Sequence, residues 1–141
     1  MIKTMEQIKC KDRVKDEYKR EIENLNDLLK LQNDYEEYED INEALSCYGL
    51  GFDYVEMGTF NDQKKPYFRL QISWGGPADE FRIYHDENLE INKIEYWFLD
   101  WFDGSFIECT NDNINNEWTL KDFLFTYYIE TSLEYCNNDC K

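Results

Sequence analysis

Four short runs of aromatic and β-branched residues between residues 52 and 109 constrain the fold of this chain most strongly. Such residues favour strands, and the turn-forming segments NDQKK, GGP and HDEN separate the runs. In the second run Phe68 and Leu70 alternate with Tyr67 and Arg69, which predicts one buried and one partly wet face. The runs are FDYVEMGTF, PYFRLQISW, EFRIY and IEYWFLDWF. They predict a four-stranded antiparallel meander, with the fourth run central because it is apolar on both faces.

An amphipathic helix is predicted before the strands, over residues 5–32. Apolar residues recur there at steps of four, four, three and four, which places them on one face of a helix. These residues are Val14, Tyr18, Ile22, Leu25 and Leu29. The charges on the other faces alternate in sign, so we expect the apolar face to pack on its own domain. The alternative use of this helix is a contact with a second copy of the chain or with another protein.

Two further helices are predicted, one on each side of the strands. The first follows Asp34, which can cap it, and ends at Gly49 after about three turns. The second begins after Thr119 as N-cap, with Trp118 placed to pack against Phe123. The predicted fold class is therefore α+β, with two N-terminal helices, a four-stranded antiparallel sheet and one C-terminal helix.

The charge of the chain is strongly acidic and unevenly distributed. It has 31 Asp and Glu against 15 Lys and Arg, which gives a formal net charge of −16. Residues 1–33 hold 8 basic and 7 acidic side chains, so the remaining 7 basic and 24 acidic side chains follow residue 33. We interpret residues 1–141 as one domain, a charge-balanced helix over 1–33 and an acidic body over 34–141. The body's charge argues against direct binding to nucleic acid or an anionic membrane and favours a basic partner.

The sequence contains only weak indications of catalytic, metal-binding or cofactor-binding residues. The five cysteines have no regular spacing and His85 is the only histidine, so we expect reduced thiols, no metal site and no cofactor. Gly75–Pro77 is expected to be a turn, because no phosphate-binding helix start follows it. Paired carboxylates could act as acid and base, but chance proximity is expected among 31 acids, so no catalytic residue is predicted. The carboxylates weighed for that role are Asp79, Glu80, Asp100 and Asp103. The chain shows no apolar run long enough to be a leader or a membrane span, so a cytoplasmic location is expected.

Candidate binding residues are instead carboxylates that could face a basic surface, together with one aromatic side chain. The exposed face of the second predicted helix forms an acidic ridge of Glu36, Glu37, Glu39, Asp40 and Glu43. Further carboxylates are expected at the hairpin ends, namely Asp79, Glu80, Asp86 and Glu87. Trp101 lies between Asp100 and Asp103, where an arginine could stack on the ring while pairing with an acid. Whether the aromatic cluster of residues 96–102 is core or interface stays open at this point.

The block LQISWGGPADEFRIY, followed by IEYWFLDWFDG, resembles small acidic proteins of phages and other mobile elements. The resemblance covers roughly residues 68–104. It implies an inhibitor of host defence of the anti-CRISPR type, some members of which mimic DNA. A row of carboxylates can occupy a groove of Lys and Arg built for phosphates, so the implied partner is the nucleic-acid-binding groove of a CRISPR effector or another nuclease.

An acidic immunity protein that neutralises a basic nuclease toxin is the alternative, because it requires the same charge complementarity. An enzyme or a ligand-binding domain is the third class, and a deep apolar pocket with converging polar groups would indicate it.

Overall fold

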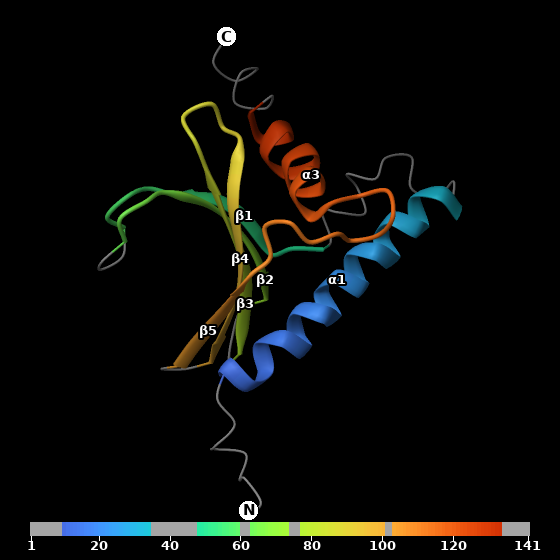
Figure 1. The fold of residues 1–141 in the computed structure, drawn as a ribbon, viewed down its shortest axis with the longest axis horizontal. Coiled ribbons are helices and arrows are strands. Elements are labelled where there is room, and N and C mark those ends of the chain that lie inside the picture. Colours follow the sequence, from blue (N-terminus) through green and yellow to red (C-terminus); the bar gives the residue numbers. More distant parts are fainter. Residues whose placement is uncertain (1–9, 35–47, 60–62, 74–76, 101–102, 134–141) are drawn as a thin grey trace, which may run out of the picture.

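A computed structural model describes residues 10–34, 48–59, 63–73, 77–100 and 103–133 (Figure 1). Helix α1 spans Cys10–Asp34 and precedes a sheet of five strands. The strands are β1 (Gly51–Val55), β2 (Tyr67–Ser73), β3 (Ala78–His85), β4 (Ile91–Asp100) and β5 (Asp103–Glu108). Helix α3 (Leu120–Leu124) continues into the π-helical turn η2 (Phe125–Ile129). None of the helices described here is long and apolar enough to cross a membrane.

The sheet is an antiparallel meander in the order β1-β2-β3-β4-β5, which confirms the α+β class. The expectation of four strands was wrong, because Asp103–Glu108 adds a fifth. This segment carries no fully buried side chain, so its sequence lacks the apolar face that identifies a strand. The fourth run was expected to be central, and β4 is an interior strand between β3 and β5, although the middle strand of the five is β3.

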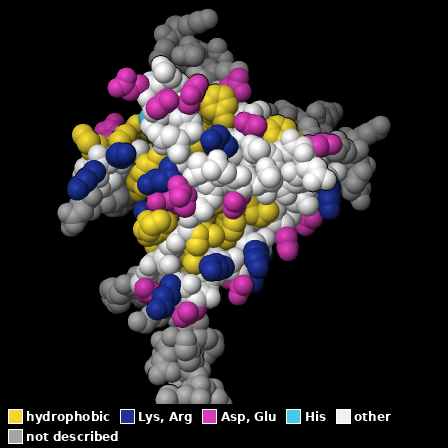
Figure 2. Space-filling view, viewed as in Figure 1, with side chains coloured by type: hydrophobic (Ala, Val, Ile, Leu, Met, Phe, Trp, Pro, Cys, Tyr) yellow, Lys and Arg dark blue, Asp and Glu magenta, His cyan; other side chains and the backbone are white. Residues whose placement is uncertain are grey.

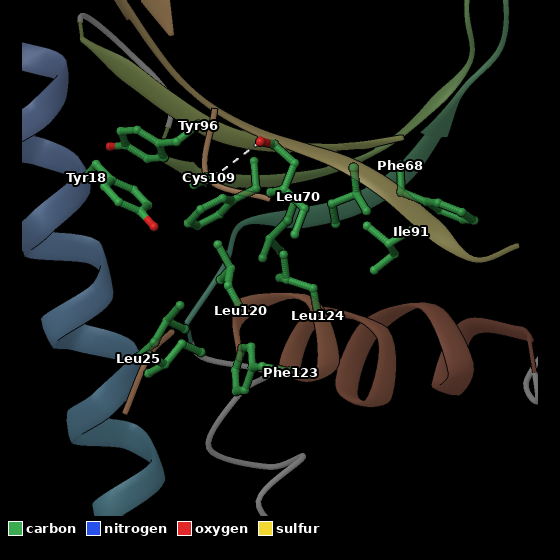
Figure 3. Packing of buried hydrophobic residues seen from close by; sticks show 14 of the residues in the cluster. Tyr18, Leu25, Phe68, Leu70, Ile91, Tyr96, Cys109, Leu120, Phe123 and Leu124 are labelled. Carbon is green, nitrogen blue, oxygen red and sulfur yellow. Dashed lines mark hydrogen bonds between the residues drawn. The ribbon is translucent and has the colours of Figure 1, made fainter. Parts of the chain in front are cut away.

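The core lies between one face of the sheet and the helices α1 and α3 (Figure 3). The predicted stripe on α1 is confirmed, because Val14, Tyr18, Leu25 and Leu29 are buried and Ile22 packs against the same cluster. α1 therefore uses its apolar face within its own domain. A dimer through this helix stays a prediction, and it would have to use the charged faces.

Polar contacts hold α1 in place against β4 and the segment that follows β5. The hydroxyl of Tyr18 donates to Asp112 at 2.6 Å, and the amide of Asn115 donates to Asn26 at 3.2 Å. The guanidinium of Arg13 lies 3.4 Å from Asp100 and 4.6 Å from the centre of the Phe98 ring. Because these contacts join α1 to residues far away in the sequence, we infer that α1, the sheet and the segment after β5 form one unit.

The start of the C-terminal helix follows the prediction. Oγ1 of Thr119 accepts a hydrogen bond from the backbone N–H of Asp122 at 3.0 Å, so Thr119 is the N-cap. Trp118 meets Phe123 edge to face at 6.3 Å, which is the predicted contact. Other predictions fall outside the described residues, namely most of the second helix (35–47), Gly75 and Gly76 of the GGP turn, and the tail after Cys136.

Glu21 is a buried carboxylate on α1 that has consequences for stability. It is 7% exposed and accepts a hydrogen bond from the Tyr48 hydroxyl at 2.7 Å. Burial raises the pKa of the Glu21 carboxyl, the hydrogen bond from Tyr48 lowers it, and the nearby Asp79 raises it further. The net direction is upward, so between the ordinary and the raised pKa the folded chain binds more protons than the unfolded chain.

We therefore expect Glu21 to cost stability at neutral pH and to cost less as the pH falls towards its ordinary pKa of about 4.3. Glu21→Gln removes the ionisation while keeping an acceptor for Tyr48. The free energy of unfolding of the wild type, relative to this variant, should rise as the pH is lowered from 7 to 5. Urea titrations at several pH values measure it, with Glu23→Gln on the exposed side of α1 as control. A difference that does not change with pH would contradict the prediction.

Candidate protein-binding face of the sheet

The second face of the sheet is turned away from both helices, and no described helix covers it (Figure 1). The strand register aligns a row of charged side chains across this face, one from each strand. From β1 to β5 the row is Asp53, Arg69, Arg82, Glu95 and Glu108. Because opposite residues in an antiparallel pair project to the same side, these five residues share one surface. We call this surface the open face.

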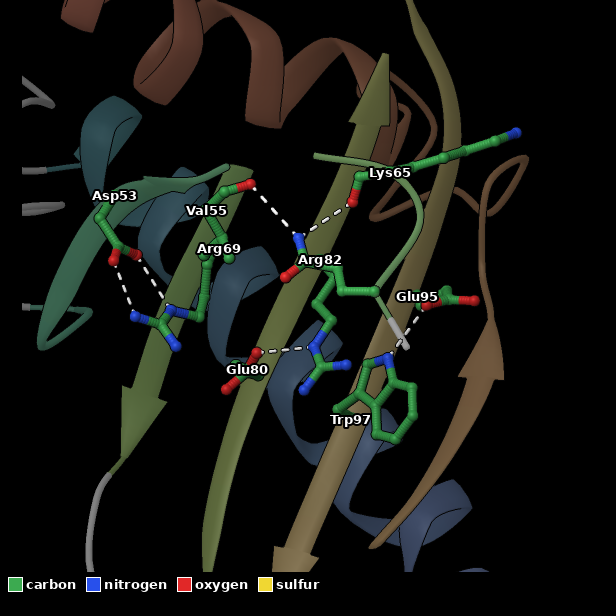
Figure 4. A network of polar contacts seen from close by, with 9 residues as sticks. Asp53, Val55, Lys65, Arg69, Glu80, Arg82, Glu95 and Trp97 are labelled. Carbon is green, nitrogen blue, oxygen red and sulfur yellow. Dashed lines mark hydrogen bonds and ion pairs between the residues drawn. The ribbon is translucent and has the colours of Figure 1, made fainter. Parts of the chain in front are cut away.

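The two arginines of the open face are each held by a carboxylate (Figure 4). The guanidinium of Arg69 donates twice to Asp53, at 3.0 and 2.7 Å, and this pairing raises the pKa of Arg69. Nε of Arg82 donates to Glu80 at 2.8 Å. The two arginines lie opposite each other on β2 and β3, where like charges repel. Their separate pairings relieve this repulsion.

Glu95 connects the charged row to an aromatic cluster on β4 and β5. It accepts a hydrogen bond from the indole N–H of Trp97 at 3.0 Å and lies 3.4 Å from Nζ of Lys93. The Arg82 guanidinium lies 4.0 Å above the centre of the Trp97 ring, and Phe106 stacks on Trp97 at 4.6 Å with 21° between the planes. The face therefore contains a continuous stack from Arg82 through Trp97 to Phe106.

Several residues of the open face are buried although no described helix lies over them. Tyr67 is 2% exposed, Glu80 5% and Glu95 6%. Long neighbouring side chains cover them, since the guanidinium of Arg82 lies 5.2 Å from the ring centre of Tyr67 and Tyr84 packs on the same ring. Burial raises the pKa of the Tyr67 hydroxyl. The open face is thus an ordered polar and aromatic layer whose side chains hold each other in place.

The β3–β4 hairpin forms one edge of the open face. A shallow hollow of about 930 Å³ lies there. Its lining residues are Lys65, Pro66, Tyr84, His85, Asp86, Glu87, Asn88, Asn92 and Lys93. Asp86 accepts hydrogen bonds from the backbone N–H groups of Asn88 and Glu90, at 2.8 and 3.0 Å, so its carboxylate shapes the turn. Glu87 is exposed, as expected for a hairpin end.

Two of the predicted hairpin-end carboxylates were misplaced. Asp79 and Glu80 lie inside β3 and are buried, on opposite faces of the sheet. Asp79 points to the helix side, where Ser73 and Tyr96 donate to it, and Glu80 lies under Arg82 on the open face. The strand alternation fixes both directions, because Phe81 faces the core, so Asp79 two residues earlier shares its side and Glu80 next to it points to the opposite face. Neither side chain can serve as an exposed anion.

Of the other predicted residues, Asp100 and Asp103 lie opposite each other where β4 pairs with β5. Asp100 pairs with Arg13, and Asp103 is exposed at the start of β5. The remaining candidates lie outside the described residues: Trp101 and the whole acidic ridge of Glu36, Glu37, Glu39, Asp40 and Glu43. Of the aromatic cluster over 96–102, Tyr96 and Phe98 belong to the core, whereas Trp97 belongs to the open face.

Sequence reasoning missed Arg82, Trp97 and Phe106 as members of one site. The alternation within β4 was visible, since Glu95 and Trp97 stand two apart, but the partners on β3 and β5 depend on register. Phe106 belongs to the strand that was not predicted. The short alternating segment in which Glu108 follows Phe106 by two positions could have indicated this strand.

The described residues offer binding groups more clearly than reactive ones. No group of three or more His, Cys, Asp or Glu side chains that could hold a metal ion occurs among them. The thiol of Cys109 is buried, and burial raises its pKa to about 12, which keeps it protonated at neutral pH. The ring of His85 is engaged by the Tyr54 hydroxyl at 3.2 Å and by its neighbour's carbonyl oxygen at 2.8 Å.

The composition of the open face, with Arg, Trp, Tyr and Phe in a fixed array, is the composition that protein interfaces favour. Comparison of the chain with protein-family models, with curated proteins and with solved structures finds no match, so this geometry is the basis for assigning a function.

Proposed function

We propose that this chain is a binding protein of the mobile-element inhibitor type, which acts on a basic, nucleic-acid-handling enzyme such as a CRISPR effector. The observation that carries the proposal is the open face, where aromatic rings and paired charges form a fixed layer on a strongly acidic chain. Fixed aromatic and arginine side chains bind a protein surface with little loss of conformational freedom. The proposal assigns no catalytic step to the chain.

The charges of the open face favour a protein partner over nucleic acid. A sheet that binds nucleic acid combines stacking rings with a surplus of Lys and Arg. Here Arg69, Arg82 and Lys93 are each engaged by a carboxylate, so these three cations are already paired within the chain. Figure 2 shows Asp and Glu side chains over the visible surface, with Lys, Arg and hydrophobic side chains among them. The net charge of the chain is nevertheless −16, and a basic surface that carries apolar contacts complements a chain of this charge with exposed apolar side chains.

More specifically, the proposal is that carboxylates of this chain mimic the phosphates of DNA. Exposed carboxylates surround the open face at the β3–β4 hairpin, where Glu87 and Glu90 lie, and on β5, where Glu108 lies. The acidic ridge over 36–43 is proposed to add to this row. A groove that binds a phosphate backbone attracts such a row at long range, and its salt dependence reports that attraction.

We expect the complex with the target effector to weaken by roughly tenfold or more between 50 and 500 mM salt, because exposed charges are screened. Dissociation constants measured by calorimetry against a panel of CRISPR effectors and basic nuclease toxins test this. The association rate should be lower for a variant in which five acidic residues are changed to Lys, namely Glu36, Glu37, Glu39, Asp40 and Glu43. Inhibition of a toxin and not of any effector would favour the immunity function. A dissociation constant that does not change with salt concentration would contradict electrostatic mimicry.

A further inference from the structure

Two arginines of this chain, Arg13 and Arg82, are each held by both an aromatic ring and a carboxylate. Arg82 lies 4.0 Å above the Trp97 ring while its Nε donates to Glu80 at 2.8 Å. Arg13 lies 4.6 Å above the Phe98 ring with its Nη1 3.4 Å from Asp100. A guanidinium suits such a place because its plane stacks on the ring while its edge donates to the acid.

The edge strand β5 presents the same two groups to the outside. Phe106 is 46% exposed, and one side of its ring is occupied by Trp97, so the other side faces outward. Glu108 lies two residues further along the strand, on the same face, and is also exposed. Oγ1 of Thr110 donates to Glu108 at 3.2 Å, which orients the carboxylate but uses only part of its capacity as an acceptor.

The strand before Phe106 is closely packed at Gly104. This residue stands two positions before Phe106 on the same face, and the Leu99 side chain fills the space beside it, because a Cβ atom at Gly104 would lie only 2.8 Å from Leu99. Access to Phe106 therefore comes from its own exposure on β5, the last strand in the sheet order. An incoming side chain can reach the outer side of the ring there.

We infer that Phe106 and Glu108 form a docking point for an arginine side chain of the partner protein. The guanidinium stacks on the outer side of Phe106, extends the stack that begins at Arg82, and donates to Glu108. This inference rests on the proposed function, since a basic enzyme surface supplies the arginine. Lysine fits less well, because a compact ammonium cannot stack and pair at the same time.

The test uses the full chain and two blocked peptides, Gly-Arg-Gly-Arg-Gly and its lysine counterpart, titrated into ¹⁵N-labelled protein. The indole N–H of Trp97 and the backbone amides of β5 report binding. We expect the arginine peptide to shift these signals and to bind about two- to fivefold more tightly than the lysine peptide. Phe106→Ala and Glu108→Gln should each abolish this preference. Met57→Ala and Glu130→Gln, which remove an exposed apolar group and an exposed charge elsewhere, should leave it unchanged.

Glu108→Gln keeps the shape of the side chain, so it remains informative if Phe106→Ala alters the strand. Equal binding of the two peptides, with shifts spread over the whole acidic surface, would overturn the docking point. So would a preference that survives both substitutions. These outcomes are separate from the proposed function, because inhibition of an effector can still occur through other surfaces when the Phe106 contact fails.

Discussion

Phe81→Ala is expected to lower the free energy of unfolding by about 3–5 kcal/mol, the range for losing a buried phenylalanine. Phe81 is fully buried on the central strand, with its ring 5.2 Å from that of Tyr96 and 6.5 Å from that of Tyr18. The ring therefore joins the sheet to α1. Stabilities of small domains are about 5–15 kcal/mol, so this loss is a large share of the total.

Urea titration followed by circular dichroism measures the effect of Phe81→Ala. Met57→Ala is the matched control, since Met57 is 68% exposed and its loss should change stability by less than about 0.5 kcal/mol. A loss of unfolding free energy close to that of the control would mean that Phe81 does not join the sheet to α1.

The second large effect is expected on the other side of the same strand, at Arg82. Arg82→Met should cost about 3 kcal/mol, because it leaves the carboxylate of Glu80, which is 5% exposed, without its cation. This figure is at the lower end of the range for buried pairs, because the Arg82 side chain keeps 19% of its exposure. The substitution also removes the guanidinium from the Trp97 ring.

A double-mutant cycle separates the charge effect from the loss of packing. Glu80→Gln combined with Arg82→Met should recover a large part of the loss, because the buried charge is gone and an apolar side chain still covers Trp97. The NMR signal of the Trp97 indole N–H reports whether the stack persists. Additive losses in the double variant would show that the Glu80 carboxylate is not stranded by removal of Arg82.

The inward-facing half of this fold was readable from local patterns. The steps of three and four along α1 indicated the residues that pack on the sheet, and the alternation of Phe68 and Leu70 on β2 indicated its buried face. Thr119 was recognised as an N-cap from its position before the helical residues. These features depend on the period of a single element, which the order of residues carries by itself.

The candidate binding face was predicted poorly, because it depends on contacts between strands. Asp79 and Glu80 were expected to be exposed anions, and their burial follows from the register of β3 with β2 and β4. Phe106 and Glu108 were not considered, since β5 has no apolar face of its own and is held in place by pairing with β4. Propensity within a short segment cannot reveal a strand that is stabilised by its neighbour.

By itself the sequence determined the α+β class, the strong negative charge, the inward stripe of α1 and the start of the C-terminal helix. Only the tertiary structure decided which acids are paired and which are exposed, and it alone brought Arg82, Trp97 and Phe106 into one stack. The physical reason is the two-residue period of a strand, which fixes the face of each side chain. The register between strands then selects its neighbour, and a shift of one residue would replace every contact on the open face.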